Sequence, residues 1–166
     1  STSSAASDVY KRQILYIKNM SDNYSLIIKN GSCYIDGKLI KSDIGLYENK
    51  IKKIGNIEEN NSKVYDASGK VVLPGIIDTQ VHFREPGSTD AEDLESGSRA
   101  AVLGGVTSLF EMPNTNPPTA NLVEFEKKLK AAKNRMHSNY AFYFGATPQN
   151  TEQLAQLKNV EGCCGV

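Results

Sequence analysis

The sequence predicts a mixed α/β protein built in two parts. Residues 14–73 contain short apolar and β-branched runs separated by turn residues, whereas residues 74–166 alternate strand-like and helix-like segments with short connections. The second pattern is typical of parallel βαβ units. A hydrophobic content of 39% over 166 residues is enough for a packed core. On periodicity alone, a doubly wound sheet and a barrel both remain compatible with this order of elements.

The composition argues against several classes of partner. The chain has 19 basic and 19 acidic side chains, so no electrostatic bias toward nucleic acid or an anionic membrane is expected. No apolar run approaches the roughly 20 residues of a membrane-spanning helix. The three cysteines are Cys33, Cys163 and Cys164, and their number and spacing fit neither a disulfide framework nor a zinc knuckle. We therefore expect reduced thiols in a cytoplasmic protein with no nucleic-acid or membrane partner.

The N-terminal part begins with an uninformative segment and continues as β structure. Residues 1–13 are rich in small polar side chains and lack the apolar core of a secretory signal, so we expect a disordered tail or a cloning remnant. In residues 14–73, the dipeptides Asn30-Gly31 and Asp36-Gly37 predict turns, the second of them in a hairpin. This part is predicted to be a small antiparallel β unit with a structural role.

The most informative stretch is residues 74–87, which read PGIIDTQVHFREPG. It is bounded by two Pro-Gly turn signals and is rich in β-branched and apolar residues, which predicts a strand buried on both faces. Alternation along that strand places Asp78, Gln80, His82 and Arg84 on one face. Burying four polar side chains costs desolvation free energy that packing alone would not recover. We therefore expect a functional site at this strand.

The segments that follow continue the alternation. Apolar periodicity, β-branched runs and capping residues predict, in order, a helix over 91–103, a strand over 106–112, a helix over 121–136, a strand over 140–145, a short helix over 151–157 and the opening of a fourth strand over 162–166. Three helical connections between four strands predict a parallel sheet.

Two motifs carry a family resemblance. The segment DTQVHFREPG resembles the first barrel strand of the amidohydrolase superfamily, whose members carry Asp-x-His-x-His there as metal ligands, and Arg84 with the Glu-Pro-Gly that follows narrows the resemblance to dihydroorotases. The segment EMPNTNPPT, residues 111–119, is similar to the strand-two motif of the same enzymes. The resemblance covers roughly residues 26–166. In one respect the sequence departs from the family, because Gln80 stands where the family has the first histidine.

Of the two folds that fit the periodicity, a doubly wound sheet and a barrel, the resemblance implies the barrel. It implies a partial (β/α)8 TIM barrel over residues 74–166, comprising the first three to four βα units, preceded by a β-sandwich segment over 14–73. Such a barrel needs about 250 residues, so we expect this chain to be the N-terminal part of a longer enzyme. Catalytic groups of parallel barrels gather at the C-terminal ends of the strands. His82, Arg84 and Asn114 fall at those ends in two separate motifs.

The resemblance also implies a metal site. His82 would be a ligand of Zn²⁺, present as one or two ions, although a lone histidine in a strand can also be structural. Gln80 is a weaker candidate, because an amide oxygen coordinates hard cations but is a poor zinc ligand. The alternative is that Gln80 only forms hydrogen bonds at a degraded metal position. The catalytic Asp of the family has no counterpart in this chain, so this fragment alone is expected to be inactive.

Substrate binding is assigned by the same resemblance. Arg84 and Asn114 correspond to the Arg and Asn that hold the substrate carboxylate in dihydroorotases, and a guanidinium suits that role as a planar fork. Arg84 could instead pair with Glu85 or Glu111, and Asn114 could cap a turn.

The implied activity is the reversible hydrolysis of dihydroorotate to N-carbamoyl-aspartate in pyrimidine synthesis. Three alternatives remain open at this point: an allantoinase or hydantoinase type of cyclic amidase, a non-catalytic homologue that serves as a structural partner, and a bare scaffold or binding module. Besides its small-molecule substrate, the partners we expect for the protein are a second copy of the chain, in a homo-oligomer, or a carbamoyltransferase. Gln80 is the main argument for the non-catalytic alternative.

Overall fold

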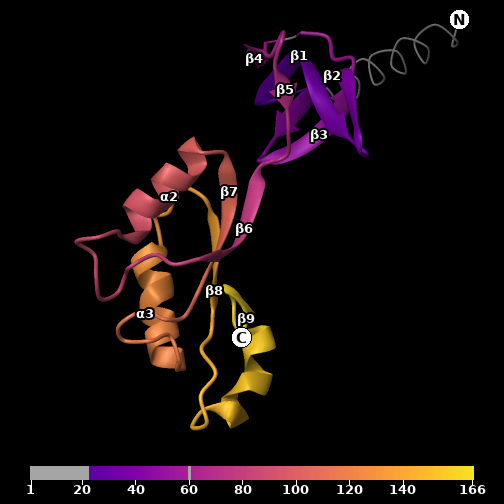
Figure 1. The fold of residues 1–166 in the computed structure, drawn as a ribbon. Coiled ribbons are helices and arrows are strands. Elements are labelled where there is room, and N and C mark those ends of the chain that lie inside the picture. The colour runs from indigo at the N-terminus through magenta and orange to yellow at the C-terminus, as the bar shows by residue number, and fades with distance from the viewer. Residues whose placement is uncertain (1–22, 60) are drawn as a thin grey trace, which may run out of the picture. The chain divides into compact units, whose positions relative to one another are not determined.

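The computed structural model describes residues 23–59 and 61–166. The chain divides into two compact units, the first ending at Pro74 and the second running from Gly75 to Val166 (Figure 1). The expectation of a tail or cloning remnant at residues 1–13 lies outside the described residues.

The first unit is a five-stranded sheet. Its strands are β1 (Leu26–Ile35), β2 (Lys38–Tyr47), β3 (Lys50–Gly55), β4 (Lys63–Asp66) and β5 (Val71–Val72). The order is β3-β2-β1-β4, with β5 also paired to β1. The first three strands are antiparallel, but β4 and β5 run parallel to β1, so the prediction of a purely antiparallel unit is wrong. The strand β4 pairs with β1 on the edge opposite to β2, so the chain after β3 crosses to that edge of the sheet. This crossing makes β4 parallel to β1, where an antiparallel strand was expected.

Turn chemistry explains one hairpin of this unit and a bulge. Asp36 and Gly37 have φ of 48° and 79° and connect β1 to β2 as predicted, because this tight turn needs positive φ at both residues. Asn30 also has a positive φ of 63°, but Asn30-Gly31 lies inside β1, where the pairing with β2 shifts register. The predicted turn at this dipeptide is therefore a β-bulge.

The second unit alternates strands and helices as predicted (Figure 1). The strands β6 (Ile76–Val81), β7 (Val106–Glu111), β8 (Asn139–Tyr143) and β9 (Cys163–Gly165) form a parallel sheet in the order β6-β7-β8-β9. Between them lie α2 (Leu94–Leu103), α3 (Leu122–Ala132) and the 3-10 helix η1 (Thr151–Asn159). Sequential parallel strands with helical connections are the βαβ pattern of a barrel segment. No helix in the described ranges is long and apolar enough to cross a bilayer.

Side-chain caps explain why the two α-helices begin where they do. Asp93 Oδ1 accepts a hydrogen bond from Ser96 N at 2.7 Å and caps α2, so the helix starts at Leu94 rather than at residue 91. Asn121 Oδ1 accepts one from Glu124 N at 2.9 Å and caps α3. Helix α3 ends at Ala132, four residues before the predicted end.

The core of this unit packs the sheet against its helices. Phe142 and Phe144 lie two residues apart at β8 and are fully buried on one face. The Phe125 ring from α3 lies 6.4 Å from the Phe142 ring, edge to face, and 6.3 Å from the Phe144 ring. Such aromatic pairs contribute roughly 0.5–1.5 kcal/mol each beyond their buried area. Leu94 of α2 and Leu109 of β7 complete the same cluster.

Strand β6 is exposed at its beginning, contrary to the prediction that it is buried on both faces. Ile76 and Ile77 are 57% and 60% exposed. The physical reason is that, within the described residues, β6 is an edge strand and pairs with β7 alone. Further along, Val81 packs against the core, and Phe83, which follows the strand, is buried in it. The predicted alternation is not seen at Ile77 and Thr79, which were expected on the same face and are exposed.

Candidate functional site

The candidate site lies at the C-terminal ends of β6 and β7, where the two sequence motifs meet. His82 directly follows β6, and Asn114 lies in the loop after β7. His82 Nδ1 is 2.8 Å from Asn114 Oδ1. Because an amide oxygen only accepts hydrogen bonds, Nδ1 carries the proton in this contact, and Nε2 keeps its lone pair. This tautomer is the one that leaves Nε2 able to coordinate a cation.

Backbone contacts hold the two motif loops together. Asn116 N donates to the Pro86 carbonyl oxygen at 3.1 Å. Gly87 has a φ of 119°, and a Cβ at this position would lie 2.7 Å from the Asn116 carbonyl oxygen. Both the conformation and the space therefore require glycine. The Pro-Gly that ends the first motif thus serves to dock one loop on the other.

Arg84 is exposed, and its guanidinium has no partner among the described residues. Neither predicted alternative forms, because Glu85 is taken by Arg135 and Glu111 is taken by Lys128. An exposed cation two residues after His82, with no partner in the described part of the chain, remains available to an anionic ligand.

Gln80, the penultimate residue of β6, lines a depression of about 480 Å³. The depression is also lined by Met112 after β7 and by Tyr143 at the end of β8. Gln80 N donates to Asp78 Oδ1 at 3.0 Å, where the pairing of β6 with β7 is irregular, so Asp78 shapes the end of the strand. The Gln80 side-chain amide has no hydrogen-bond partner in the part of the chain that the structure describes. It is therefore free to face a ligand.

The predicted metal ligands do not form a cluster by themselves. Over residues 23–59 and 61–166, no group of three or more His, Cys, Asp or Glu side chains gathers closely enough to hold a metal ion. Among the described residues, His82 keeps one ring nitrogen free for a cation, and the side-chain amide of Gln80 also has no hydrogen-bond partner there.

A buried ion pair beside the site escaped the sequence reasoning. Lys128 of α3 and Glu111 of β7 are 3% and 1% exposed, with Nζ 3.1 Å from Oε2, and neither has another polar partner among the described residues. Burial raises the pKa of Glu111 to about 7, although the neighbouring Lys128 opposes the rise, and burial lowers the pKa of Lys128. One feature of the sequence could have indicated the burial of Lys128, namely its position on the apolar stripe of α3 between Phe125 and Ala132.

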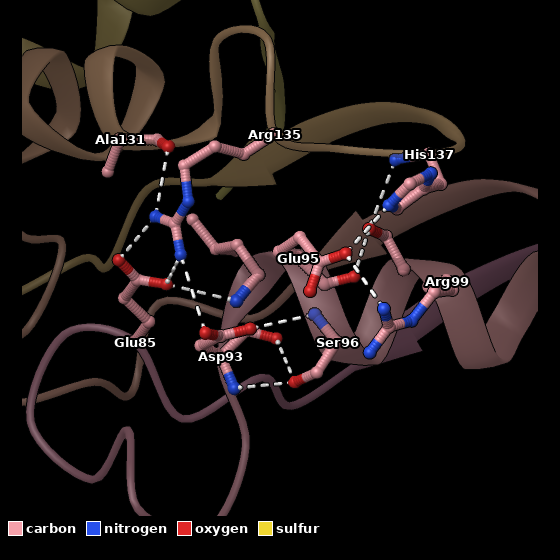
Figure 2. A network of polar contacts seen from close by, with 10 residues as sticks. Glu85, Asp93, Glu95, Ser96, Arg99, Ala131, Arg135 and His137 are labelled. Carbon is pink, nitrogen blue, oxygen red and sulfur yellow. Dashed lines mark hydrogen bonds and ion pairs between the residues drawn. The ribbon is translucent and has the colours of Figure 1, made fainter.

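A second contact that the sequence did not predict holds the side chain of Glu85, the residue after Arg84. The Glu85 carboxylate accepts two hydrogen bonds from Arg135, from Nη1 at 2.7 Å and from Nη2 at 3.0 Å, and a third from Leu94 N at 3.0 Å (Figure 2). Burial works against this carboxylate, but these donors outweigh it and lower its pKa. No sequence pattern links residues 50 positions apart.

The comparison with known families decides the affiliation. The sequence profile of the Amidohydrolase family matches residues 71–162, which is more than half of the chain. The chain belongs to the amidohydrolase family. Proteins of this family act as hydrolases, and cyclic amidases are among the relatives that this chain matches.

Similar curated proteins carry two different names. A dihydroorotase of Lactobacillus helveticus is 40% identical over 130 residues, which cover 77% of this chain and 30% of that protein. An allantoinase of Desulfitobacterium hafniense is 38% identical over 146 residues, which cover 87% of this chain and 32% of that protein. The chain thus spans about a third of the length of the curated relatives it matches.

Solved structures agree with the barrel prediction. The L-hydantoinase (dihydropyrimidinase) from Arthrobacter aurescens matches with a TM-score of 0.79 and 30% identity, covering 86% of this chain and 32% of that one. A D-hydantoinase from a Thermus species matches with a TM-score of 0.66 and 32% identity, covering 81% and 30%. These relatives have the TIM-barrel amidohydrolase fold, so the second unit is a segment of such a barrel.

Proposed function

We propose that the protein is a metal-dependent cyclic amidase of the dihydroorotase type, which interconverts (S)-dihydroorotate and N-carbamoyl-L-aspartate in pyrimidine synthesis. The observation that supports this most is the 2.8 Å contact between His82 and Asn114. It joins a metal-ligand candidate to a carboxylate-binding candidate. The second carboxylate-binding candidate, Arg84, follows His82 by two residues and has no partner among the described residues.

The carboxylate specificity follows from the donors that remain free. Asn114 Oδ1 is occupied by His82, so its amide NH₂ still has hydrogens to donate. Arg84 adds a planar fork suited to bidentate carboxylate binding. Both groups recognise an anion, and dihydroorotate carries a carboxylate beside its ring, whereas hydantoin and allantoin carry none.

The donors at the rim fit one part of a divalent metal site. His82 would hold the cation through Nε2, and Asn114 would fix the ring through Nδ1, as hydrogen-bonded partners of ligating histidines commonly do. The Gln80 amide oxygen would be a second, weaker ligand. When bound, a divalent cation such as Zn²⁺ lowers the pKa of water and polarises an amide carbonyl. The remaining ligands and the proton-transferring carboxylate are proposed to come from other barrel strands.

Two other functions have specific support. The allantoinase of D. hafniense is nearly as similar as the dihydroorotase and covers more of this chain, which favours a cyclic amidase for a neutral ring. Gln80 favours a non-catalytic homologue, because it replaces the imidazole that the family places at this position.

The deciding experiment uses the protein at its full natural length. Hydrolysis of dihydroorotate, allantoin and hydantoin is measured for the wild type, for Arg84→Met and for the control Arg99→Met, which removes an exposed arginine of α2. We expect dihydroorotate to be the best substrate, with its KM raised about 30-fold by Arg84→Met, since a hydrogen-bonded charge contact contributes roughly 2 kcal/mol. Allantoin or hydantoin turned over fastest, with no effect of Arg84→Met, would establish a neutral-ring amidase instead. Inertness toward all three would support the non-catalytic homologue.

A further inference from the structure

The carboxylate of Glu85 has two arginines as possible partners, its chain neighbour Arg84 and the distant Arg135. It is the chain neighbour of Arg84 and carries a carboxylate, so it could neutralise the very cation that is proposed to bind substrate. In the structure, the Glu85 carboxylate instead contacts Arg135 (Figure 2). Arg84 has no partner within residues 23–59 and 61–166.

Arg135 is well built for this task. Its guanidinium donates to both oxygens of Glu85, at 2.7 and 3.0 Å, and its Nη1 also donates to the Ala131 carbonyl oxygen at 3.1 Å. Nη2 lies 3.5 Å from Asp93 Oδ2. The fork geometry is specific to arginine, because a lysine would offer a point charge without two parallel donors. The carboxylate is thus held by a residue from the connection between α3 and β8.

The carboxylate is also anchored from its other side. Leu94 N, the first N–H of α2, donates to Glu85 Oε2 at 3.0 Å, and the Glu85 side chain is only 17% exposed. An anion at a helix N-terminus is further stabilised by the helix dipole. Within the described residues, the polar contacts of Glu85 are thus with Arg135 and with the start of α2, and none is with its neighbour Arg84.

We propose that Arg135 is a positioning residue that sequesters Glu85 and so keeps the Arg84 guanidinium free for the carboxylate of the substrate. The proposal rests on the proposed function for the identity of the ligand. The sequestration itself does not depend on the ligand, because it concerns only whether Glu85 pairs with Arg135 or with Arg84.

Three variants separate this role from general support of the loop. Arg135→Met releases Glu85, which then competes for Arg84. Glu85→Gln combined with Arg135→Met removes the competing charge while leaving an amide oxygen for Leu94 N. Arg99→Met is the matched control, because Arg99 pairs with Glu95 of the same helix and, in the described part of the structure, makes no polar contact with Glu85.

The measurements are the Kd of orotate by calorimetry and the rate of Arg84 labelling by phenylglyoxal, read by mass spectrometry on the protein at its full natural length. We expect Arg135→Met to weaken orotate binding and to slow Arg84 labelling about five-fold each, which is the scale of an exposed ion pair. The double variant should restore both values, and Arg99→Met should change neither. If Arg135→Met acted only by loosening the loop, adding Glu85→Gln would not restore orotate binding or Arg84 labelling.

The outcomes distinguish this proposal from the proposed function. Unchanged orotate binding and labelling in Arg135→Met, or a double variant no better than the single one, would overturn the sequestration of Glu85. If labelling of Arg84 follows the expected pattern while the wild type neither binds orotate nor hydrolyses dihydroorotate, sequestration stands and the dihydroorotase assignment falls.

Discussion

The buried pair of Lys128 and Glu111 gives a stability prediction whose size depends on pH. We consider Lys128→Met, which keeps the length of the side chain but leaves Glu111 buried without a cation. Removing one partner of a buried ion pair costs roughly 3–5 kcal/mol. Protonation of Glu111 limits this cost, because a neutral carboxyl is easier to bury. The loss should therefore be smallest in acid and should grow as the pH rises.

The dependence on pH follows from the pKa of Glu111. Burial raises it in the folded wild type from 4.5 to about 7, so the folded protein binds this proton more tightly than the unfolded chain does. The contribution of this proton to stability is therefore fully present below pH 4.5 and is lost as the pH rises through about 7. Without Lys128 the pKa rises further, and in the variant the loss continues above pH 7 at roughly 1.4 kcal/mol per pH unit.

The assay is urea unfolding followed by circular dichroism at pH 6, 7 and 8. The difference in unfolding free energy between wild type and Lys128→Met should grow by roughly 1 kcal/mol from pH 7 to pH 8, because the wild type, with a Glu111 pKa of about 7, also loses a small part of this contribution in that range. Lys127→Met is the matched control, because Lys127 is 67% exposed and pairs only with Glu124 on the surface of α3. A difference that stays constant across the three pH values would refute the assignment of Glu111 as the buried titrating group.

Three further predictions concern the rim and the helix that follows it. Gln80→His should increase the bound metal per chain, measured by atomic emission, if Gln80 is a weakened ligand position; unchanged metal content would remove Gln80 from the site. Gly87→Ala should lower stability by about 2 kcal/mol, because φ is 119° and Asn116 O blocks the Cβ, and a melting temperature equal to wild type would contradict this. Asn121→Ala should cost about 1 kcal/mol by removing the cap on Glu124 N, whereas Asn121→Asp should retain it.

The order of elements and the location of the site could be predicted from the sequence because both depend on local patterns. Strand periodicity, caps and Pro-Gly punctuation identified the βαβ segments, since side-chain alternation and the first turn of a helix involve residues close in sequence. The two motifs placed His82 and Asn114 at the ends of neighbouring strands, and the structure brings them to 2.8 Å. Parallel strands in sequence order made this meeting predictable.

Other features were decided only by tertiary structure, because they depend on residues far apart in the chain. The parallel direction of β4 and the exposure of Ile76 depend on which strand pairs with which. Glu85 pairs with Arg135, which lies 50 positions away, and not with its chain neighbour Arg84. The sequence thus determined which groups the rim carries. The tertiary structure determined which of them are free, because charges pair with the nearest available partner in space.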